Sequence, residues 1–197
     1  MYGKTSGGVG SPLLIDSERR VVSADGFAES ARNGNCYSGA NQTGCVWTVG
    51  LATTNTGLCV ANPIGSGKIL SILAAGYSEI VAPTGITDAW IAGGYHASTN
   101  VVIGAGAAGT AINMKLGGSA GVGKVWTGCT LPVAPVYLFP IMTGHTSGAL
   151  SVSAAPGLVR IDGLVHVPAG GFVIIANFTI GVAVGAKGAI LWEELDA

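Results

Sequence analysis

The sequence predicts an all-β protein, a jelly-roll-like β-sandwich with an extended N-terminal arm, and three observations lead to this prediction. About ten short runs of apolar residues, many β-branched or aromatic, are separated mostly by Gly, Pro or Asn, at roughly 8–12-residue spacing. No segment carries an apolar helical stripe for three turns. Glycine accounts for 33 of the 197 residues, more than twice its usual share of about 7 %. A chain of this length suits a double-sheet jelly roll.

The distribution of charge divides the chain into two parts. Eight of the 19 charged side chains lie in residues 1–32, whereas residues 33–67 and 125–159 have none. We therefore predict a polar arm over residues 1–40 and an apolar β-sandwich body over residues 41–197. The arm is too poor in apolar residues to fold alone, so we expect it to lie on a neighbouring subunit or on its own body.

Each element is predicted from a local run of residues. In the arm we expect strands at residues 12–15 and 20–22 and one helical turn at residues 27–32. The Asp162-Gly163 pair is a strong turn signal, so residues 158–161 and 164–167 are expected to form a hairpin. The body's strands are predicted at residues 45–49, 58–61, 69–73, 89–92, 101–103, 136–139, 158–161, 164–167, 172–176 and 189–192.

One segment raises the question of a membrane. Residues 169–186 are uncharged, yet Asn177, Thr179, several glycines and many β-branched residues interrupt any spanning helix, which needs roughly 20 mainly apolar residues. We expect two adjacent buried strands there. The N-terminus has one Lys and no apolar run, so no signal peptide is expected.

The four cysteines, Cys36, Cys45, Cys59 and Cys129, contain no C-x-x-C pair and have no histidine at zinc-ligand spacing. Buried free thiols are the expectation, because a free cysteine behaves as a small hydrophobic residue. A disulfide between Cys36 and Cys45 stays open as an alternative.

The low charge itself predicts self-association. The net charge is −1 with nine basic residues, which excludes a footprint for nucleic acid or an acidic membrane surface. Only 10 % of residues are charged, against about 25 % in ordinary domains. A lone sandwich needs charges on its edges, so we expect copies of this chain to cover its surface. The aromatic residues assigned to that subunit interface are Trp47, Trp90, Trp126 and Trp192.

Two glycine-rich segments imitate nucleotide sites and fail on their surroundings. Residues 104–109 match G-x-G-x-x-G after a β-branched run, but no long helix follows and the next acidic residue is Asp162, far too late. Residues 65–68, Gly-Ser-Gly-Lys, lack both the first glycine and the Ser or Thr that complete a phosphate-binding loop. A glycine-rich strand and a turn are the better interpretations.

Titratable residues give no catalytic pattern either. His96, His145 and His166 are far apart and form no metal-binding motif. Glu193 and Glu194 are adjacent on a predicted strand, so they point to opposite faces, and we interpret them as a solvated strand end. We therefore expect no enzyme, no cofactor and no metal.

Two patches of the body resemble a known class of proteins. Residues 56–70, which contain Ala-Asn-Pro-Ile-Gly-Ser-Gly-Lys, resemble a strand–turn–strand of jelly-roll proteins in tailed-phage virions. Residues 168–194, which begin Pro-Ala-Gly-Gly and end Trp-Glu-Glu, resemble the last strands of those proteins. The resemblance implies a capsid decoration (cement) protein, or a related head or tail fibre domain. Such proteins are commonly trimers on the outer surface of the capsid.

Sequence and resemblance together predict a homotrimeric structural protein of the virion, assembled in the host cytoplasm. Its partner would be the major capsid protein of the phage head, contacted through Arg19, Arg20 and Arg32 of the arm. The family supplies no catalytic residues. One alternative is a tail or head-fibre module that binds a receptor glycan, and another is an enzyme that binds a nucleotide through residues 104–109.

Overall fold

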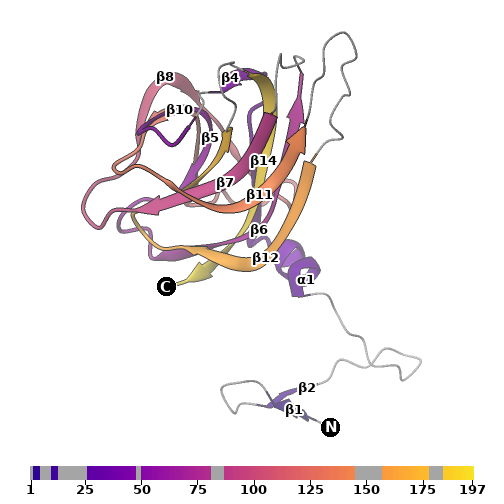
Figure 1. Ribbon diagram of the computed structural model, residues 1–197. Coiled ribbons are helices and arrows are strands. Elements are labelled where there is room, and N and C mark those ends of the chain that lie inside the picture. Colours follow the sequence, from indigo (N-terminus) through magenta and orange to yellow (C-terminus); the bar gives the residue numbers. More distant parts are fainter. Residues whose placement is uncertain are drawn as a thin grey trace.

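The computed structural model describes residues 2–4, 10–12, 26–47, 50–80, 87–144, 157–177 and 184–197. It confirms the predicted fold class, because two antiparallel β-sheets face each other as a β-sandwich (Figure 1). The strand predicted at residues 20–22 lies outside the described residues. Of the strand predicted at residues 12–15, only Pro12 is described.

Six strands form the first sheet. Their spatial order is β11 (Val136–Gly144), β7 (Thr87–Tyr95), β13 (Gly171–Asn177), β5 (Thr54–Ala61), β10 (Lys124–Thr130) and β8 (Val102–Ala108). The second sheet has the order β12 (Gly157–Val167), β6 (Lys68–Glu79), β14 (Val184–Asp196), β3 (Cys36–Ala40) and β9 (Ala111–Asn113), and β4 (Cys45–Trp47) also pairs with β14. A separate two-stranded sheet joins β1 (Tyr2–Lys4) to β2 (Gly10–Pro12).

Eight of these strands are wound as a jelly roll. They form four nested antiparallel pairs, from the outermost to the innermost: β3 with β14, β5 with β13, β6 with β12, and β7 with β11. The ribbon of nested pairs is rolled up, so that β14 also pairs with β6 and β13 with β7. Among consecutive members of the eight, every connection crosses from one sheet to the other except that between the innermost pair, β7 and β11, which both lie in the first sheet. This is the double-sheet jelly-roll pattern. Strands β8, β9 and β10 are inserted between β7 and β11.

Strand β5 shows how the core is built on both faces of the first sheet. Leu58 and Val60 point between the two sheets into the main core, whereas Cys59 and Ala61 point to the outer face. This alternation follows from the two-residue period of a strand. The outer face is buried as well, because Val101 and other loop residues cover it.

Strand β13 lies inside the first sheet, and all seven of its residues are buried. A strand covered on both faces has a continuous apolar sequence rather than an alternating one. This explains the uncharged run at residues 169–186, of which 171–177 belong to β13 and 184–186 to β14. The prediction of a buried strand is confirmed for residues 171–177, and residues 184–186 begin a second strand, in which Ala186 is buried.

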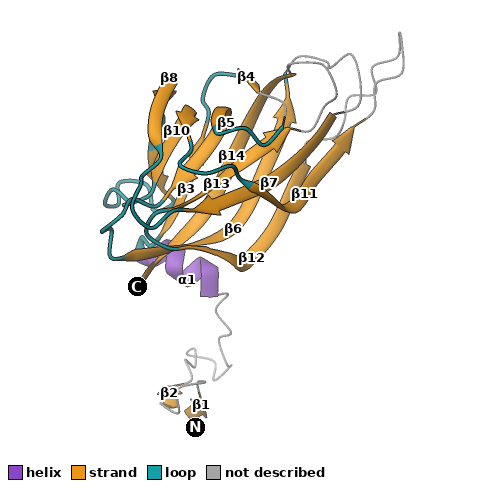
Figure 2. Ribbon diagram, turned by 60° about the vertical axis from the view of Figure 1, so that its left-hand side comes forward, coloured by secondary structure: helices purple, strands orange, loops and turns teal. Residues whose placement is uncertain are grey.

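Helix α1 (Gly26–Asn33) confirms the helical turn predicted at residues 27–32. It lies at the end of the sandwich where the chain's C-terminus also lies (Figure 2). The Ser30 hydroxyl donates a hydrogen bond to the Glu193 carboxylate of β14, which fixes the helix to the second sheet. No helix in the described part of the chain is long and apolar enough to cross a membrane.

The hairpin predicted at Asp162-Gly163 is wrong. Residues 157–167 form one strand, β12, which pairs with β6 on both sides of a register shift between Arg160 and Val165. Asp162 and Gly163 have positive φ angles of 50° and 80°. These conformations are those a tight hairpin turn requires, but here they form a β-bulge that bends the strand.

The predicted boundary between arm and body also needs correction. Strand β3 (Cys36–Ala40), assigned to the arm, pairs with β14 and β9 inside the second sheet. The sandwich therefore includes residues before 41. Strands β9 and β10 have no counterpart among the predicted strands.

Candidate functional site

An apolar hollow opens where β11 and β12, the edge strands of the two sheets, meet. It has a volume of about 400 Å³. Two adjacent glycines of β7 shape it, because a Cβ on Gly94 would lie 2.6 Å from the Phe172 ring and one on Gly93 would lie 3.2 Å from Leu138. The described residues that line it include no Asp, Glu, Lys or Arg: Gly93, Gly94, Tyr95, Val136, Leu138, Leu164, Val165, His166, Val167, Pro168, Phe172 and Val173.

Several large side chains around this hollow are exposed. Tyr95 is 54 %, Val136 60 %, Leu138 39 % and Leu164 77 % accessible to solvent. Single exposed apolar residues are ordinary, but a contiguous exposed group around a concavity is typical of an interaction site. We call the hollow and these four side chains the hollow edge.

The opposite edge of the second sheet carries a group of exposed apolar side chains. Ile112 of β9, Met114 and Leu116 are 44 %, 46 % and 86 % exposed. Their two-residue spacing places Ile112 and Met114 on the same side while the chain is extended. We call these three residues the knob edge. Four strand spacings separate β9 from β12, which corresponds to about 19 Å at about 4.8 Å per spacing.

The turn that carries Leu116 is held by a buried amide. Asn113, 6 % exposed, donates from Nδ2 to the carbonyls of Gly34 and Ser119 at 2.8 and 3.0 Å. Its Oδ1 accepts a hydrogen bond from the Lys115 backbone N–H at 2.9 Å. The turn is closed by a hydrogen bond from the Gly118 N–H to the Lys115 carbonyl at 2.7 Å. Leu116 therefore projects into solvent from a fixed support.

The terminal strands in the order of each large sheet, β11 and β8 in the first and β12 and β9 in the second, are protected against the addition of another strand. The β12 edge contains the Asp162 bulge and an exposed ion pair between Arg160 and Asp162, at 3.0 Å. Strand β11 has two register shifts and Pro140, β8 faces a register shift in β10, and β9 is three residues long. Bulges, proline, charges and short edges all prevent open-ended pairing. Contacts through these edges must therefore use side chains.

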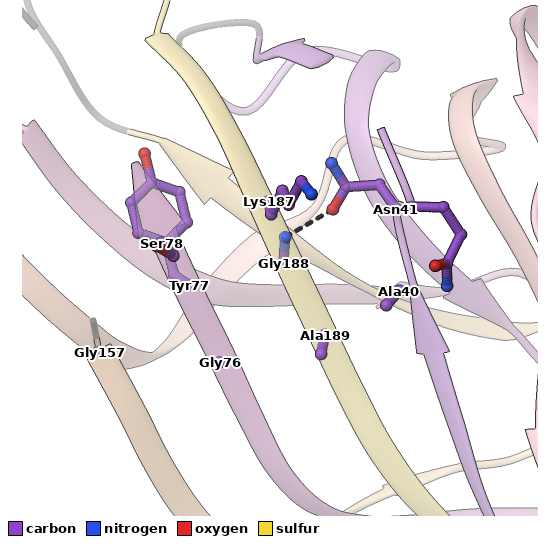
Figure 3. A pocket seen from close by; sticks show the side chains of 10 residues that line it. Ala40, Asn41, Gly76, Tyr77, Ser78, Gly157, Lys187, Gly188 and Ala189 are labelled. Carbon is purple, nitrogen blue, oxygen red and sulfur yellow. Dashed lines mark hydrogen bonds between the residues drawn. The ribbon is translucent and has the colours of Figure 1, made fainter. Parts of the chain in front are cut away.

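A second concave surface lies on the outer face of the second sheet (Figure 3). Its volume is about 390 Å³. Its floor is made of small residues, Ala40, Gly76, Gly157, Gly188 and Ala189, and its polar rim is made of Gln42, Ser78 and Lys187.

Asn41 also lines this outer-face hollow, but its amide serves the fold. Its Oδ1 accepts from the Gly188 N–H, as Figure 3 shows, and its Nδ2 donates to the Ala186 carbonyl at 2.9 Å. The residue is only 3 % exposed. The groups that a ligand would meet are therefore those of the rim.

Two of the four tryptophans predicted at a subunit interface belong to the chain's own core. Trp47 and Trp192 are 1 % and 0 % exposed. Trp47 packs edge-on against Tyr77, with ring centroids 5.4 Å apart, and Trp192 stacks on Tyr37 at 6.0 Å. A side chain without exposed surface cannot contact a partner, so the interface assignment of these two residues is wrong.

The other predicted site residues are placed as follows. Trp90 is half-buried against Tyr137, and Trp126 is half-buried at the outer cluster of the first sheet. Their interface role stays a prediction. Arg32 is exposed on α1, whereas Arg19 and Arg20 lie outside the described residues. The residues of the hollow and knob edges were not singled out from the sequence.

The two glycine-rich segments that imitate nucleotide sites form a strand and a turn. Residues 102–108 form strand β8, and the next described element is strand β9 rather than a helix. Gly106 closely approaches Thr127 and Gly128 of β10, where a side chain has no room. Residues 65–67 belong to the turn before β6, with positive φ angles at Gly65 and Gly67, and Lys68 begins β6. Lys68 forms an ion pair with Asp196 at 2.7 Å.

Glu193 and Glu194 do point to opposite faces, but the solvated strand end predicted for them is wrong. Glu193 accepts the Ser30 hydrogen bond on the outer face. Glu194, 8 % exposed, accepts hydrogen bonds from the backbone N–H groups of Val122 and Gly123 and from the Trp192 indole, at 3.1, 3.0 and 3.3 Å. A carboxylate with three donors serves to hold the loop before β10.

Among the described residues no cluster of His, Cys, Asp and Glu is arranged to hold a metal ion. Cys36, Cys59 and Cys129 are buried free thiols, as predicted, so no Cys36–Cys45 disulfide is present. Burial raises the pKa of the Cys59 thiol well above its usual value. Because the thiolate is the reactive form, the burial and raised pKa of Cys59 are those of a core residue.

Comparison with models of protein families, with curated proteins and with solved structures found no match for this chain. The surfaces described above are therefore interpreted from their own geometry.

Proposed function

We propose that this protein is a structural protein that associates with copies of itself into a closed homotrimer. The observation that carries the proposal is the presence of two unlike apolar surfaces, the hollow edge and the knob edge, on opposite sides of one sandwich. When two unlike surfaces bind each other, the subunits associate head to tail. Such contacts form a closed ring when the successive rotations from subunit to subunit lead back to the first subunit. The protected edge strands oppose the competing outcome, an open fibre of paired strands.

We further propose that the trimer is a capsid decoration protein of a tailed phage and binds the major capsid protein on the outside of the head. The support comes from the resemblance of residues 56–70 and 168–194 to such virion proteins. These segments include most of β5, the turn before β6, all of β13 and much of β14. Arg32 on the exposed side of α1 is available for a contact with a capsid subunit.

Light scattering after size exclusion tests the first part. Three chains of 19.5 kDa give 58.5 kDa, and a 19.5 kDa species at micromolar concentration would overturn self-association.

Co-sedimentation with phage heads tests the second part, the binding to the capsid. Saturable binding to heads and none to unassembled host proteins is expected, and a trimer that stays in the supernatant would remove the capsid assignment.

The outer-face hollow favours a second candidate, a tail or head-fibre module that binds a glycan. Its small-residue floor leaves room for a flat ligand, and Gln42, Ser78 and Lys187 offer hydrogen-bonding groups at the rim. Binding to a glycan array that is lost in Gln42→Ala and Ser78→Ala variants would favour this candidate. An array without signal, with binding to heads retained, would favour the decoration protein.

A further inference from the structure

We propose that Leu116 of one copy inserts into the hollow edge of the next copy, so that the two edges form a single head-to-tail interface. This inference rests on the proposed self-association and names the surfaces that perform it. Leu116 is the most exposed large apolar side chain in the described part of the chain, at 86 %. The hollow is a concave apolar surface whose lining includes no Asp, Glu, Lys or Arg.

The two surfaces fit in size and chemistry. A cavity of about 150 Å³ lined by aliphatic and aromatic residues holds a benzene molecule. The hollow, at about 400 Å³, therefore has room for Leu116 and for part of a neighbouring side chain such as Met114. The lining residues Gly93, Leu138 and Phe172 carry no charge. An aliphatic side chain can therefore bind there without leaving a buried charge that has no partner.

Leu116 can reach the hollow edge only from another copy of the chain. Within one chain the knob edge lies beside β9 and the hollow edge beside β12, at opposite ends of the second sheet. The turn that carries Leu116 is fixed by the buried Asn113 amide, so it cannot fold back across the sheet. The same fixed turn lowers the conformational entropy that Leu116 loses on binding, because the backbone is already ordered.

Two variants test the contact. Leu116→Asp places a carboxylate in the hollow, and we expect the association constant to fall at least about thirtyfold, the loss typical of a hot-spot residue. Circular dichroism of the separated subunits should match that of the parent, because the side chain is solvated in the single chain. Ile80→Asp is the matched control, since Ile80 is 51 % exposed at the end of β6, outside both edges. It should leave the oligomer intact.

A cross-link gives a second, independent measurement. Leu116→Cys subunits are mixed with Val136→Cys subunits and oxidised by air, which takes two electrons and two protons from each thiol pair. A disulfide-linked dimer that contains one subunit of each kind is expected.

The outcomes separate the inference from the proposed function. A monomeric parent protein overturns self-association itself. An oligomeric parent that withstands Leu116→Asp and gives no mixed cross-link overturns this contact alone. A cross-link between two Leu116→Cys subunits instead of the mixed pair shows a symmetric interface and overturns the head-to-tail arrangement.

Discussion

The indole ring of Trp47 occupies the space that a side chain on Gly188 would need. A Cβ on Gly188 would lie 2.8 Å from Cη2 of Trp47, and one on Gly57, in the opposite sheet, would lie 2.9 Å from Cε3. The ring is therefore held between a glycine of each sheet. Its Nε1 donates to the Ala186 carbonyl at 3.1 Å, which satisfies its one polar atom.

A methyl group at this position should destabilise the fold. We expect Gly188→Ala to lower the free energy of unfolding by about 1–3 kcal/mol, because overpacking in a filled core forces neighbours to move. Urea denaturation followed by tryptophan fluorescence measures the change. Gly76→Ala is the control: its Cβ would meet nothing closer than 3.7 Å, and a change within about 0.5 kcal/mol is expected. Equal losses in the two variants would contradict this account of Trp47.

Glu194 should contribute more to stability than its neighbour Glu193. Glu194→Gln turns one carboxylate oxygen into an N–H donor that faces backbone donors at Val122 or Gly123. A loss of about 1–3 kcal/mol in the free energy of unfolding is expected for the unsatisfied buried group. Glu193→Gln changes one contact, with Ser30, and should cost less. If thermal denaturation shows a larger loss of stability for Glu193→Gln than for Glu194→Gln, the 118–123 loop does not depend on Glu194.

The three buried free cysteines should resist thiol reagents in the folded protein. Cys36, Cys59 and Cys129 are 3 %, 0 % and 1 % exposed, and burial raises the pKa of Cys59. Since the thiolate is the reactive form, alkylation at pH 8 should modify these positions only after denaturation. Mass spectrometry of the peptides identifies the modified residues. Rapid labelling of Cys59 in the native state would contradict its place in the outer cluster.

The exposed pair between Lys68 and Asp196 should have a measurable pH signature. The Lys68 ammonium donates to the Asp196 carboxylate at 2.7 Å, which lowers the pKa of that carboxyl below its usual 3.8. Because the folded pKa is the lower one, the stabilisation is present above pH 3.8 and is lost as the pH falls through the folded value. An NMR titration of Asp196 should show a lower midpoint in the parent protein than in Lys68→Met. Identical midpoints would mean that the pair does not persist in solution.

Much of the sandwich could be predicted from local patterns, because burial on one or both sides of a strand appears directly in the sequence. The runs around Leu58, Ile91 and Ile174 all lie in strands. Strand β6 was predicted only to residue 73, although it continues to Glu79. Gly76 lies inside this unpredicted part of the strand and lines the hollow on its outer face.

The wrong predictions concern residues whose local chemistry is compatible with two different structures. Asp162-Gly163 supplies the positive φ angles of a hairpin turn and equally those of a bulge, and only the pairing of β12 with β6 decides between them. A tryptophan suits a core and an interface equally. What distinguishes Trp47 is the pair of glycines around it, which are 10 and 141 residues away in the sequence. The knob and hollow edges depend on which strands end each sheet, and that is a property of topology.

The nesting of strand pairs has a consequence for the order of events during synthesis. Strand β14 is the shared neighbour of β3, β4 and β6. Until the ribosome has made residues 184–196, these three strands lack the partner that joins them. Pairings this distant in sequence form slowly, because the ends of a long loop must first meet. The second sheet is therefore completed only after β14 has been synthesised, and a nascent chain stalled before β14 leaves β3, β4 and β6 without their shared neighbour.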